Sequence, residues 1–508
     1  MATPNEKLAD SLTALRELQN TGARVFRSSE ISRVHRERLI EAGFLQEVIK
    51  GWVMSASPAT GKGDTTPWFA SFWEFCARYC EERFGADWHL APEQSLLLHA
   101  EATAIPKQVI IYSPQGANNT LTLLFGTSFY DLKQKEMPPA ADLAVKNGLR
   151  VFDLAAALIR VPESFFQRNP IEAQVALVSV RSASPLLERL LDGGHSVVAS
   201  RLVGAFRAVG RKDIADEIES AMRAAHYEIR PSNPFEAAQV LAALDVGRPP
   251  IVARIEALWA QSRAAVSAAF PPPPGLPADA EQYMRDVEEN YKHDAYHSLS
   301  IEGYTVSLEL IERVRSGAWN PETDQSDKDN ANALAARGYW QAFQAVKETI
   351  TSILEGKPPG PLVSEAHRAW YREMFQPSVT AGIVPPRALA GYRNSPVFLR
   401  GSWHVPPRAE VVPDAMDALF TLLANEPEAA VRAVLGHWLI GYIHPFPDGN
   451  GRLARFLMNA MLASGGYPWT IVRKDDRDRY LQALEKASID NDMGPFATFL
   501  AGRVGAPL

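Results

Sequence analysis

One short segment of this 508-residue chain stands out for its combination of chemically capable side chains: His444 to Arg455, which reads HPFPDGNGRLAR. Its apolar flanks predict two buried helices, one ending at His444 and one beginning after the Gly-Asn-Gly turn. The N-terminus of a helix is a site for anions, because unpaired backbone N–H groups and the positive end of the dipole point outward together. The arginines suit phosphate oxygens, and His444 is the only local side chain able to accept a proton near neutral pH. The spacing therefore predicts a phosphate cradle beside a general base, equipment for attack of a hydroxyl on phosphorus.

The same segment matches the motif HxFx[D/E]GNGRxxR position for position, and it resembles the Fic family. The resemblance implies transfer of AMP from ATP to a tyrosine, threonine or serine hydroxyl of a target protein, with release of pyrophosphate. His444 would be the base, Asp448 would hold Mg²⁺ through a hard carboxylate oxygen, and Phe446 would anchor the loop. The residues implied to bind the phosphates are Gly449, Asn450, Gly451, Arg452 and, at the distal phosphate, Arg455.

Alternatives within the family stay open at this point. In its phosphotransferase branch a lysine replaces the second glycine of the loop, whereas this chain has Gly451, which favours AMP transfer. UTP or CDP-choline in place of ATP is not excluded by the loop. For the nucleobase we expect Tyr480 in the helix after the motif, although Tyr480 could equally be a core aromatic residue.

A second match to the family lies upstream, in AYHSLSIEGYTVS. Ser298, Glu302 and Gly303 fit the inhibitory motif [S/T]xxxE[G/N], and positions i and i+4 share one helical face. The resemblance implies that Glu302 pairs with Arg455 in the space of the γ-phosphate, so that ATP binds unproductively. We therefore expect an enzyme that is inhibited at rest.

A third segment, AGYRNSPVFLRGSWHVPPRAEV, is similar to the β-hairpin flap that covers the active site in this family. Pro396–Leu399 is expected to be extended, Gly401-Ser402 to turn, and Trp403–Pro407 to return. An exposed strand edge can align a target segment by main-chain hydrogen bonds.

The fold class that follows is mainly α, with an all-helical Fic domain and its flap preceded by a winged helix-turn-helix and an α+β middle domain. The predicted parts are 1–58 (winged helix), 59–245 (regulatory α+β), 246–279 (helix and the PPPPG linker) and 280–508 (catalytic, with the inhibitory helix). The winged helix followed by an α+β segment is similar to antitoxin-like regulators of the AbiEi type.

The N-terminal part carries a local basic patch, with five arginines between residues 24 and 38. A contact with DNA is expected at Arg33, Arg36 and Arg38, and the alternative is a docking module whose arginines are merely solvated. A different class of function follows from the first reading: a DNA-binding transcriptional or antitoxin-like regulator that uses the Fic domain as a nucleotide sensor.

Overall composition is ordinary for a globular protein, with 46% hydrophobic residues and a net charge of −7. No global positive field therefore favours nucleic acid or anionic lipid. Two cysteines four residues apart, no signal-like start and no long apolar run predict a cytoplasmic protein that binds no membrane. The sequence leaves open whether the chain forms a homodimer.

Overall fold

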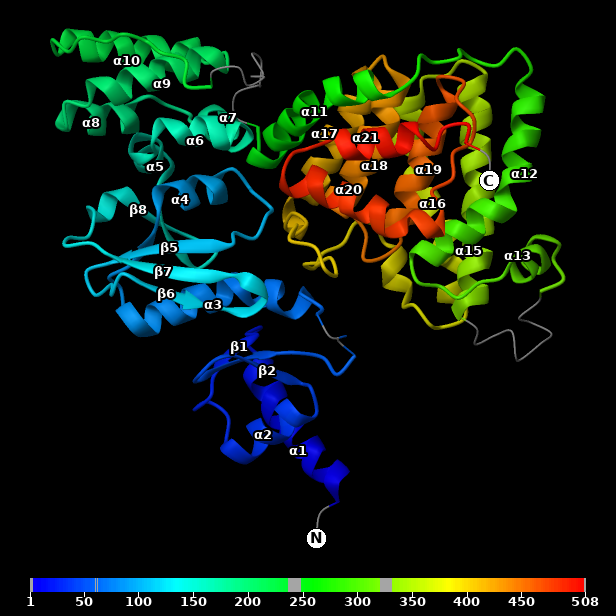
Figure 1. Cartoon of the computed structure of the whole chain (residues 1–508), viewed down its shortest axis with the longest axis horizontal. Coiled ribbons are helices and arrows are strands. Elements are labelled where there is room, and N and C mark those ends of the chain that lie inside the picture. The colour runs from blue at the N-terminus through cyan, green and yellow to red at the C-terminus, as the bar shows by residue number, and fades with distance from the viewer. Residues whose placement is uncertain (1–2, 60, 62, 236–247, 320–330, 507–508) are drawn as a thin grey trace. The chain divides into compact units, whose positions relative to one another are not determined.

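The computed structural model describes residues 3–59, 61, 63–235, 248–319 and 331–506. The described chain is mainly helical, which confirms the predicted class (Figure 1). It divides into two compact units, and the boundary predicted at 245/246 lies outside the described residues. The first unit comprises Met1–Pro250 and Phe398–Val405, and the second comprises Ile251–Val397 and Pro406–Leu508.

The first unit begins with two helices and a small antiparallel sheet. Thr3 starts the first helix with a capping box, in which its side chain accepts from the Glu6 N–H and the Glu6 carboxylate accepts from the Thr3 N–H. The sheet has the order β1-β3-β2, and Gly51, at φ +90°, makes the turn between its last two strands. These elements are α1 (Pro4–Gln19), β1 (Val25–Arg27), α2 (Arg33–Glu41), β2 (Leu45–Ile49) and β3 (Trp52–Ser55). The helices and the strand pair are those that the sequence predicts, and the likeness to a winged helix stays a prediction.

The middle part of the first unit is an α+β layer followed by helices. Its sheet has the order β4-β5-β7-β6, with β5 and β7 parallel, and the aromatic side chains of α3 pack against it in one core. The elements of this layer are α3 (Thr66–Phe84), β4 (His89–Leu90), α4 (Pro92–His99), β5 (Gln108–Ser113), β6 (Asn119–Thr122), β7 (Ser128–Lys133), β8 (Leu143–Lys146) and β9 (Leu149–Phe152). The helices are α5 (Leu154–Arg160), α6 (Glu163–Arg168), α7 (Pro170–Val178), α8 (Ser184–Asp192), α9 (Ser196–Ala208) and α10 (Lys212–Ala224).

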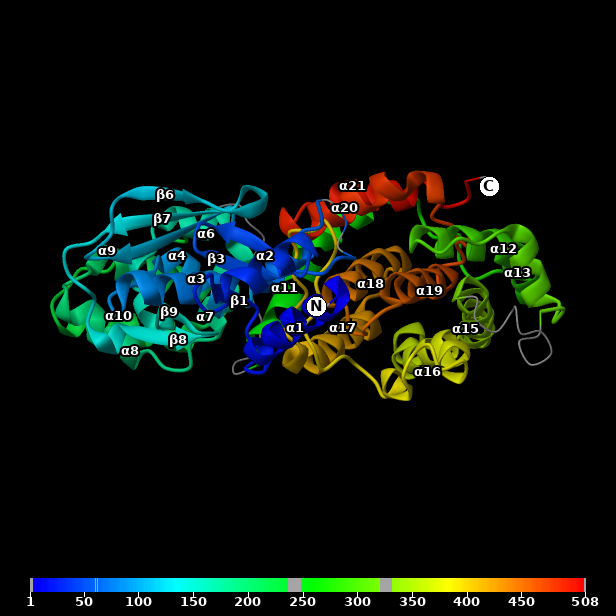
Figure 2. The same ribbon diagram turned by 90° about the horizontal axis from the view of Figure 1, so that it is seen from below.

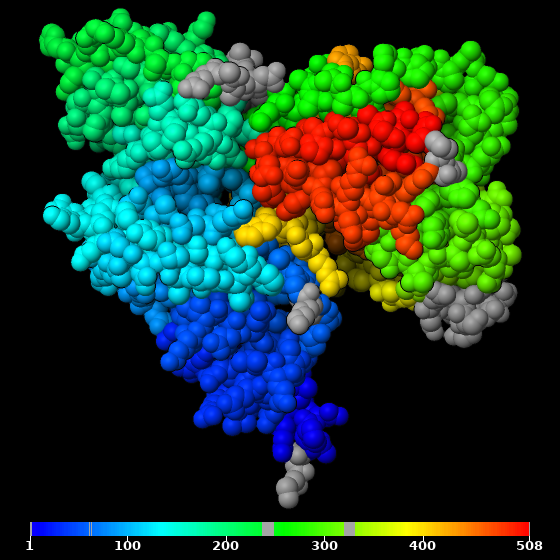
Figure 3. Space-filling model, viewed as in Figure 1, coloured from blue at the N-terminus to red at the C-terminus, as the bar shows by residue number. Residues whose placement is uncertain are grey.

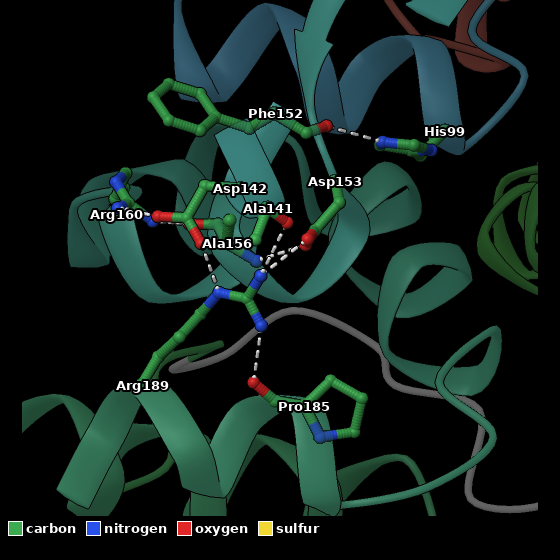
Figure 4. Close-up of polar contacts among 9 residues, drawn as sticks. All are labelled: His99, Ala141, Asp142, Phe152, Asp153, Ala156, Arg160, Pro185 and Arg189. Carbon is green, nitrogen blue, oxygen red and sulfur yellow. Dashed lines mark hydrogen bonds and ion pairs between the residues drawn. The ribbon is translucent and has the colours of Figure 1, made fainter. Parts of the chain in front are cut away.

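A largely buried ion-pair network joins the hairpin β8–β9 to these helices (Figure 4). Arg189 of α8 donates from Nε to Asp142 at 2.7 Å and from Nη2 to Asp153 at 2.7 Å. Asp142 also pairs with Arg160 of α5. Because both arginines keep carboxylate partners, the burial of their charge is compensated within the unit.

The second unit is helical throughout its regular structure. Its helices are α11 (Pro250–Ala269), α12 (Ala280–Ile301), α13 (Leu308–Arg315), α15 (Ala331–Leu354), α16 (Pro359–Thr380), α17 (Val412–Asn425), α18 (Ala429–Ile443), α19 (Asn450–Ala463), α20 (Arg477–Ile489) and α21 (Gly494–Ala501). Helices α18 and α19 lie side by side at its centre in both ribbon views (Figures 1 and 2). In the space-filling view α20 and α21 cover one side of it (Figure 3).

Helix α11 packs on this helical core and does not behave as a linker. Arg254 donates to the Tyr442 hydroxyl at 2.8 Å, and Arg263 pairs with Glu426 at 2.9 Å. The proline run that follows is also held, since the Tyr467 hydroxyl donates to the Pro271 carbonyl at 2.6 Å. The compact unit therefore begins near Ile251, ahead of residue 280.

The segment expected to form a flap differs from a paired hairpin. Its turn is present, with the Ser402 N–H bonded to the Leu399 carbonyl at 3.2 Å, but Phe398–Val405 belongs to the first unit. There His404 forms an isolated antiparallel bridge with Ala104, and the Trp403 ring packs 5.2 Å from Phe69. The partly buried side chains of Phe398, Trp403 and Val405 thus pack against that core, and the backbone of the segment is paired with residues 103–105 in place of its own second arm.

None of the described helices is long and apolar enough to cross a lipid bilayer.

Candidate functional site

The motif segment forms a turn between the two central helices of the second unit. Helix α18 ends at Ile443, and His444 takes a left-handed conformation with φ 50°. Gly449, at φ 78°, starts α19, a conformation that glycine adopts without steric cost. Phe446 is completely buried and stacks on Tyr371, with ring centroids 3.9 Å apart. Phe446 is therefore the hydrophobic anchor of the turn.

The orientation of His444 leaves one ring nitrogen available as a base. Its Nδ1 lies 3.3 Å from the Gly441 carbonyl, which can only accept, so Nδ1 carries the proton and Nε2 keeps its lone pair. Burial lowers the pKa of His444 to about 4, against the opposing effect of that carbonyl, and the charge of Arg393 lowers it further. The imidazole is therefore neutral at pH 7, the state that a general base requires.

Asn450 holds the turn closed through its side chain. Its Oδ1 accepts from the Phe446 N–H at 2.9 Å, and its Nδ2 donates to the Phe446 carbonyl at 2.8 Å. Because both polar atoms of the side chain are bonded to Phe446 within the turn, we expect the contribution of Asn450 to anion binding to come from its main chain, at the first turn of α19.

Arg452 is a buried cation whose hydrogen bonds are incomplete. It is 1% exposed, its guanidinium lies over the rings of Tyr304 and Phe375 at 5.2 and 5.1 Å, and Nη2 is 3.6 Å from Asp448. Its Nε and Nη2 have no hydrogen-bond acceptor among the described residues. Buried donors are nearly always satisfied in folded proteins, so these two nitrogens indicate a place for an anion.

Arg455 by contrast is fully engaged by α12. Its Nε donates to the Ser298 hydroxyl at 2.8 Å, and its Nη2 donates to the Ser298 carbonyl at 3.2 Å and to the Glu302 carboxylate at 2.7 Å. Burial alone would raise the pKa of Glu302, but Arg455 and Arg452 hold it below its usual range. Burial alone would lower the pKa of Arg455, and Glu302 raises it well above its ordinary value. The pair is therefore ionised, and the side chains predicted as inhibitory meet the last arginine of the motif.

Two glycines allow Glu302 to reach this position. A Cβ on Gly451 would lie 2.2 Å from Glu302 Oε1, so any side chain there would displace the carboxylate. Gly303, at φ 91°, ends α12 directly after Glu302 in a conformation that side chains rarely adopt. The glycines thus bring the end of α12 against the first turn of α19.

Asp448 is the candidate ligand for Mg²⁺. Its side chain is 62% exposed, and Oδ1 accepts from the Gly449 N–H at 2.6 Å. The described residues contain no group of three or more histidine, cysteine or acidic side chains able to hold a metal by themselves. Magnesium commonly takes one or two protein carboxylates together with substrate phosphates, so a single exposed aspartate beside an anion site fits this ion.

Tyr480 lies in the core. It is 2% exposed, its hydroxyl is 2.7 Å from His437 Nε2, and its ring packs against Phe496 and Phe499. Of the two roles considered from the sequence, this position is that of a core aromatic residue.

The arginines predicted to contact DNA lie on α2, in the other unit. Arg38 donates to the Lys7 carbonyl at 2.7 Å and to the Ser11 hydroxyl at 2.8 Å, and Arg36 donates to the Ser28 carbonyl. Arg33 is exposed and pairs with Glu37 of the same helix at 2.8 Å. Arg36 and Arg38 therefore hold the fold of this module.

Two residues near the site, Asp294 and Arg393, were not recognised from the sequence. Asp294 is buried on α12 one turn before Ser298 and accepts from the Tyr339 hydroxyl at 2.6 Å, and burial raises its pKa to about 6. The i, i+4 spacing from Ser298 is the one sequence signal for Asp294. Arg393 binds the backbone of the His444 turn, and no spacing rule identifies an arginine whose acceptors are distant carbonyl groups.

Comparison with known proteins identifies relatives for this part of the chain. The model of the Fic/DOC family matches residues 361–462. A protein adenylyltransferase Fic of Nematostella vectensis is 33% identical over 232 residues, which are 44% of this chain and 50% of that protein. The protein of the same name in Aedes aegypti is 30% identical, over 43% of this chain and 41% of its own length. The chain thus spans about half the length, or less, of the curated relatives it matches.

Two solved structures are also similar to part of this chain. Fic-1 from C. elegans aligns over 66% of this chain and 94% of its own, with 20% identity and a TM-score of 0.36. A Fic family protein from Desulfovibrio desulfuricans aligns over 50% of this chain and 71% of its own, with 24% identity and a TM-score of 0.34.

Proposed function

We propose that the protein transfers AMP from ATP to a hydroxyl side chain of a target protein, a proposal supported by the match of residues 361–462 to the Fic/DOC family model. The observation that carries the proposal is the turn from His444 to Arg455. It joins a neutral histidine to a helix N-terminus and to the buried Arg452, whose Nε and Nη2 have no acceptor in the part of the chain that the structure describes. The curated relatives, named protein adenylyltransferase Fic, support the same reaction.

In the reaction, His444 Nε2 takes the proton of the target serine, threonine or tyrosine as the hydroxyl oxygen attacks the α-phosphorus of ATP. The new bond joins that oxygen to the α-phosphorus, and the bond from the α-phosphorus to the bridging oxygen of pyrophosphate breaks. Pyrophosphate leaves with the electron pair, and the proton remains on His444. The Gly441 carbonyl holds Nδ1–H and so keeps Nε2 directed to this exchange.

Phosphate binding is assigned to the first turn of α19 and to the arginines after it. The N–H groups of Asn450 and Gly451 and the guanidinium of Arg452 offer donors to phosphate oxygens, and the Gly449 N–H would join them on release from Asp448 Oδ1. Asp448 would hold Mg²⁺, which neutralises phosphate charge when bound. Gly451, in place of the lysine of the phosphotransferase branch, supports AMP transfer over phosphate transfer.

The resting enzyme is inhibited by Glu302. Its carboxylate accepts a hydrogen bond from Arg455 and lies against Gly451. The carboxylate thus occupies the position in which a phosphate oxygen of ATP would contact Arg455 and Gly451. A carboxylate and a phosphate compete for the same cation, so productive ATP binding requires Arg455 to exchange one partner for the other. Ser298 assists because it occupies Arg455 Nε.

DNA binding is not part of this proposal. Arg36 and Arg38 use donors within the module, and Arg33 has an acidic neighbour on its own helix. The test is cheap: binding of a DNA duplex at low salt that is lost in the Arg33→Ala variant would restore the regulator as a second function.

The proposed reaction is tested by intact-mass spectrometry of the Glu302→Gly protein after incubation with Mg²⁺ and each nucleoside triphosphate. We expect a mass gain of one AMP unit with ATP, and none in the Glu302→Gly protein that also carries His444→Ala. Equal gains with and without His444 would refute the assignment of the base.

A further inference from the structure

Arg393 holds the backbone of the catalytic turn. Its side chain is 4% exposed, and its Nε donates to the His444 carbonyl at 2.8 Å. Its Nη2 donates to the Ile443 carbonyl at 3.3 Å, and its own backbone N–H donates to the Pro445 carbonyl at 2.8 Å. Arg393 thus binds three consecutive carbonyl groups across the end of α18.

The same guanidinium binds both ends of the segment between 395 and 407. Nη1 donates to the Ser395 carbonyl at 3.0 Å, and Nη2 donates to the Pro407 carbonyl. Every nitrogen of the guanidinium therefore has a main-chain acceptor. These acceptors come from three stretches of chain, around 395, 407 and 444, all in the second unit.

The turn needs such support for geometric reasons. The last carbonyls of a helix have no partner within the helix, and Ile443 is the last residue of α18. His444 is left-handed, which costs a residue with a side chain about 1–2 kcal/mol, and it is followed by proline, which restricts it further. Arg393 satisfies the orphan carbonyls on both sides of this strained residue.

Burying a cation against carbonyl groups alone has a cost in stability. Burial lowers the pKa of Arg393 to about 10, and the negative charge of Glu410 opposes this effect only in part. A neutral apolar side chain in the same space would avoid this cost but would leave the carbonyl groups of Ile443, His444, Ser395 and Pro407 without the donor that positions them. A role in geometry explains the charge better than a role in stability.

We infer that Arg393 is a positioning residue for nucleotide transfer: it fixes the orientation of His444 and ties the two ends of the 395–407 segment to the same turn. The expected effect on kcat rests on the proposed function. The claim that Arg393 holds the backbone of the turn rests on the hydrogen bonds alone.

The experiment compares Arg393→Lys and Arg393→Gln with a matched control, all in the Glu302→Gly protein. Arg432→Lys is the control, because Arg432 is also a buried arginine of this unit, 8% exposed, that donates to a main-chain carbonyl, that of Glu426. It lies at the opposite end of α18 from His444. Three quantities are measured for each variant: Tm, Kd for ATP, and kcat for AMP transfer.

We expect kcat to fall at least ~10-fold in both Arg393 variants, because a displacement of about 1 Å in a catalytic group costs up to ~100-fold. The Kd for ATP should stay within about twofold, because the groups of α19 that would bind phosphate are unchanged. The Arg393→Lys variant should retain a higher kcat than Arg393→Gln. Arg432→Lys should leave kcat within about twofold while lowering Tm. Retention of kcat in both Arg393 variants, or a fall that the control reproduces, overturns the inference.

Hydrogen exchange gives a reading that does not depend on transfer activity. In the Arg393 variants we expect faster amide exchange in peptides that cover 393–407 and 443–450, and unchanged exchange in those of α15 and α20. Exchange that is unchanged in the turn overturns the inference. Should the Glu302→Gly parent transfer no AMP at all, the proposed function fails, and the exchange data still decide the role of Arg393.

Discussion

Removal of the Glu302 carboxylate is the perturbation that best tests the proposed inhibition. Glu302 Oε1 lies 2.7 Å from Arg455 Nη2, and the carboxylate also lies where a Cβ on Gly451 would stand. The Glu302→Gly variant removes the competing anion and leaves the base, the turn and Arg452 unchanged. We therefore expect faster AMP transfer.

The size of the effect follows from the ion pair. A hydrogen bond to a charged group contributes about 1.5–3 kcal/mol. Since the Glu302 side chain is 27% exposed, we take the lower part of that range, ~1.5–2 kcal/mol. Each 1.4 kcal/mol is a factor of ten in an equilibrium, so the active fraction should rise roughly 10–30-fold. Glu302→Gln, which keeps a neutral acceptor, should give a smaller rise.

The assay is the initial rate of AMP incorporation at fixed Mg²⁺ and ATP. Glu289→Gln is the matched control, because Glu289 is an exposed acid on the same helix α12. Its rate should equal that of the unmodified protein. A Glu302→Gly protein that binds ATP normally but transfers AMP no faster than the unmodified protein would refute the inhibitory role of Glu302.

Three other outcomes follow from the structure. Burial lowers the pKa of His444, the proposed base, to about 4. If His444 is the base, the transfer rate should be flat above about pH 5.5 and fall only as the pH approaches 4, and an acid limb centred near the ordinary histidine pKa of about 6.5 would contradict the assignment. Tyr339→Phe leaves the buried Asp294 carboxylate without its 2.6 Å donor and should lower the free energy of unfolding by about 1–3 kcal/mol, measured by urea denaturation. An unchanged free energy of unfolding would show that another donor satisfies Asp294. Arg189→Met leaves Asp142 with one of its two arginine partners and should destabilise the first unit by about 3 kcal/mol, measured by thermal unfolding. The rate of AMP transfer at 25 °C, which we assign to the second unit, should be unchanged.

The sequence predicted the central helices and the turn because their signals are local. Apolar spacing identified α18 and α19, and the Gly-Asn-Gly run identified the helix start between them. The helix from 280 appeared for the same reason, and the i, i+4 spacing placed Ser298 and Glu302 on one face. The positions of these side chains against Arg455 required the resemblance to a family, because pairing across more than 150 residues leaves no local pattern.

Other features depend on tertiary contacts that no local pattern reports. The residues after 395 have the glycine and proline spacing of a β-hairpin, yet Trp403 and Phe398 pack into the first unit. Burial of these two side chains therefore outweighed strand pairing across the turn. Helix α11 was expected to lead into a linker, and only Arg254 and Arg263, bonded to Tyr442 and Glu426, join it to the helical core. Burial of polar groups is equally hidden from the sequence.

The most direct test of the central claim uses ATP labelled at one phosphate at a time, incubated with the Glu302→Gly protein and Mg²⁺. The α-labelled nucleotide should leave its label on protein, the γ-labelled nucleotide should leave none, and His444→Ala should remove the α-label. Label retained from the γ-phosphate, or from neither position while ATP binds normally, would contradict AMP transfer by this chain.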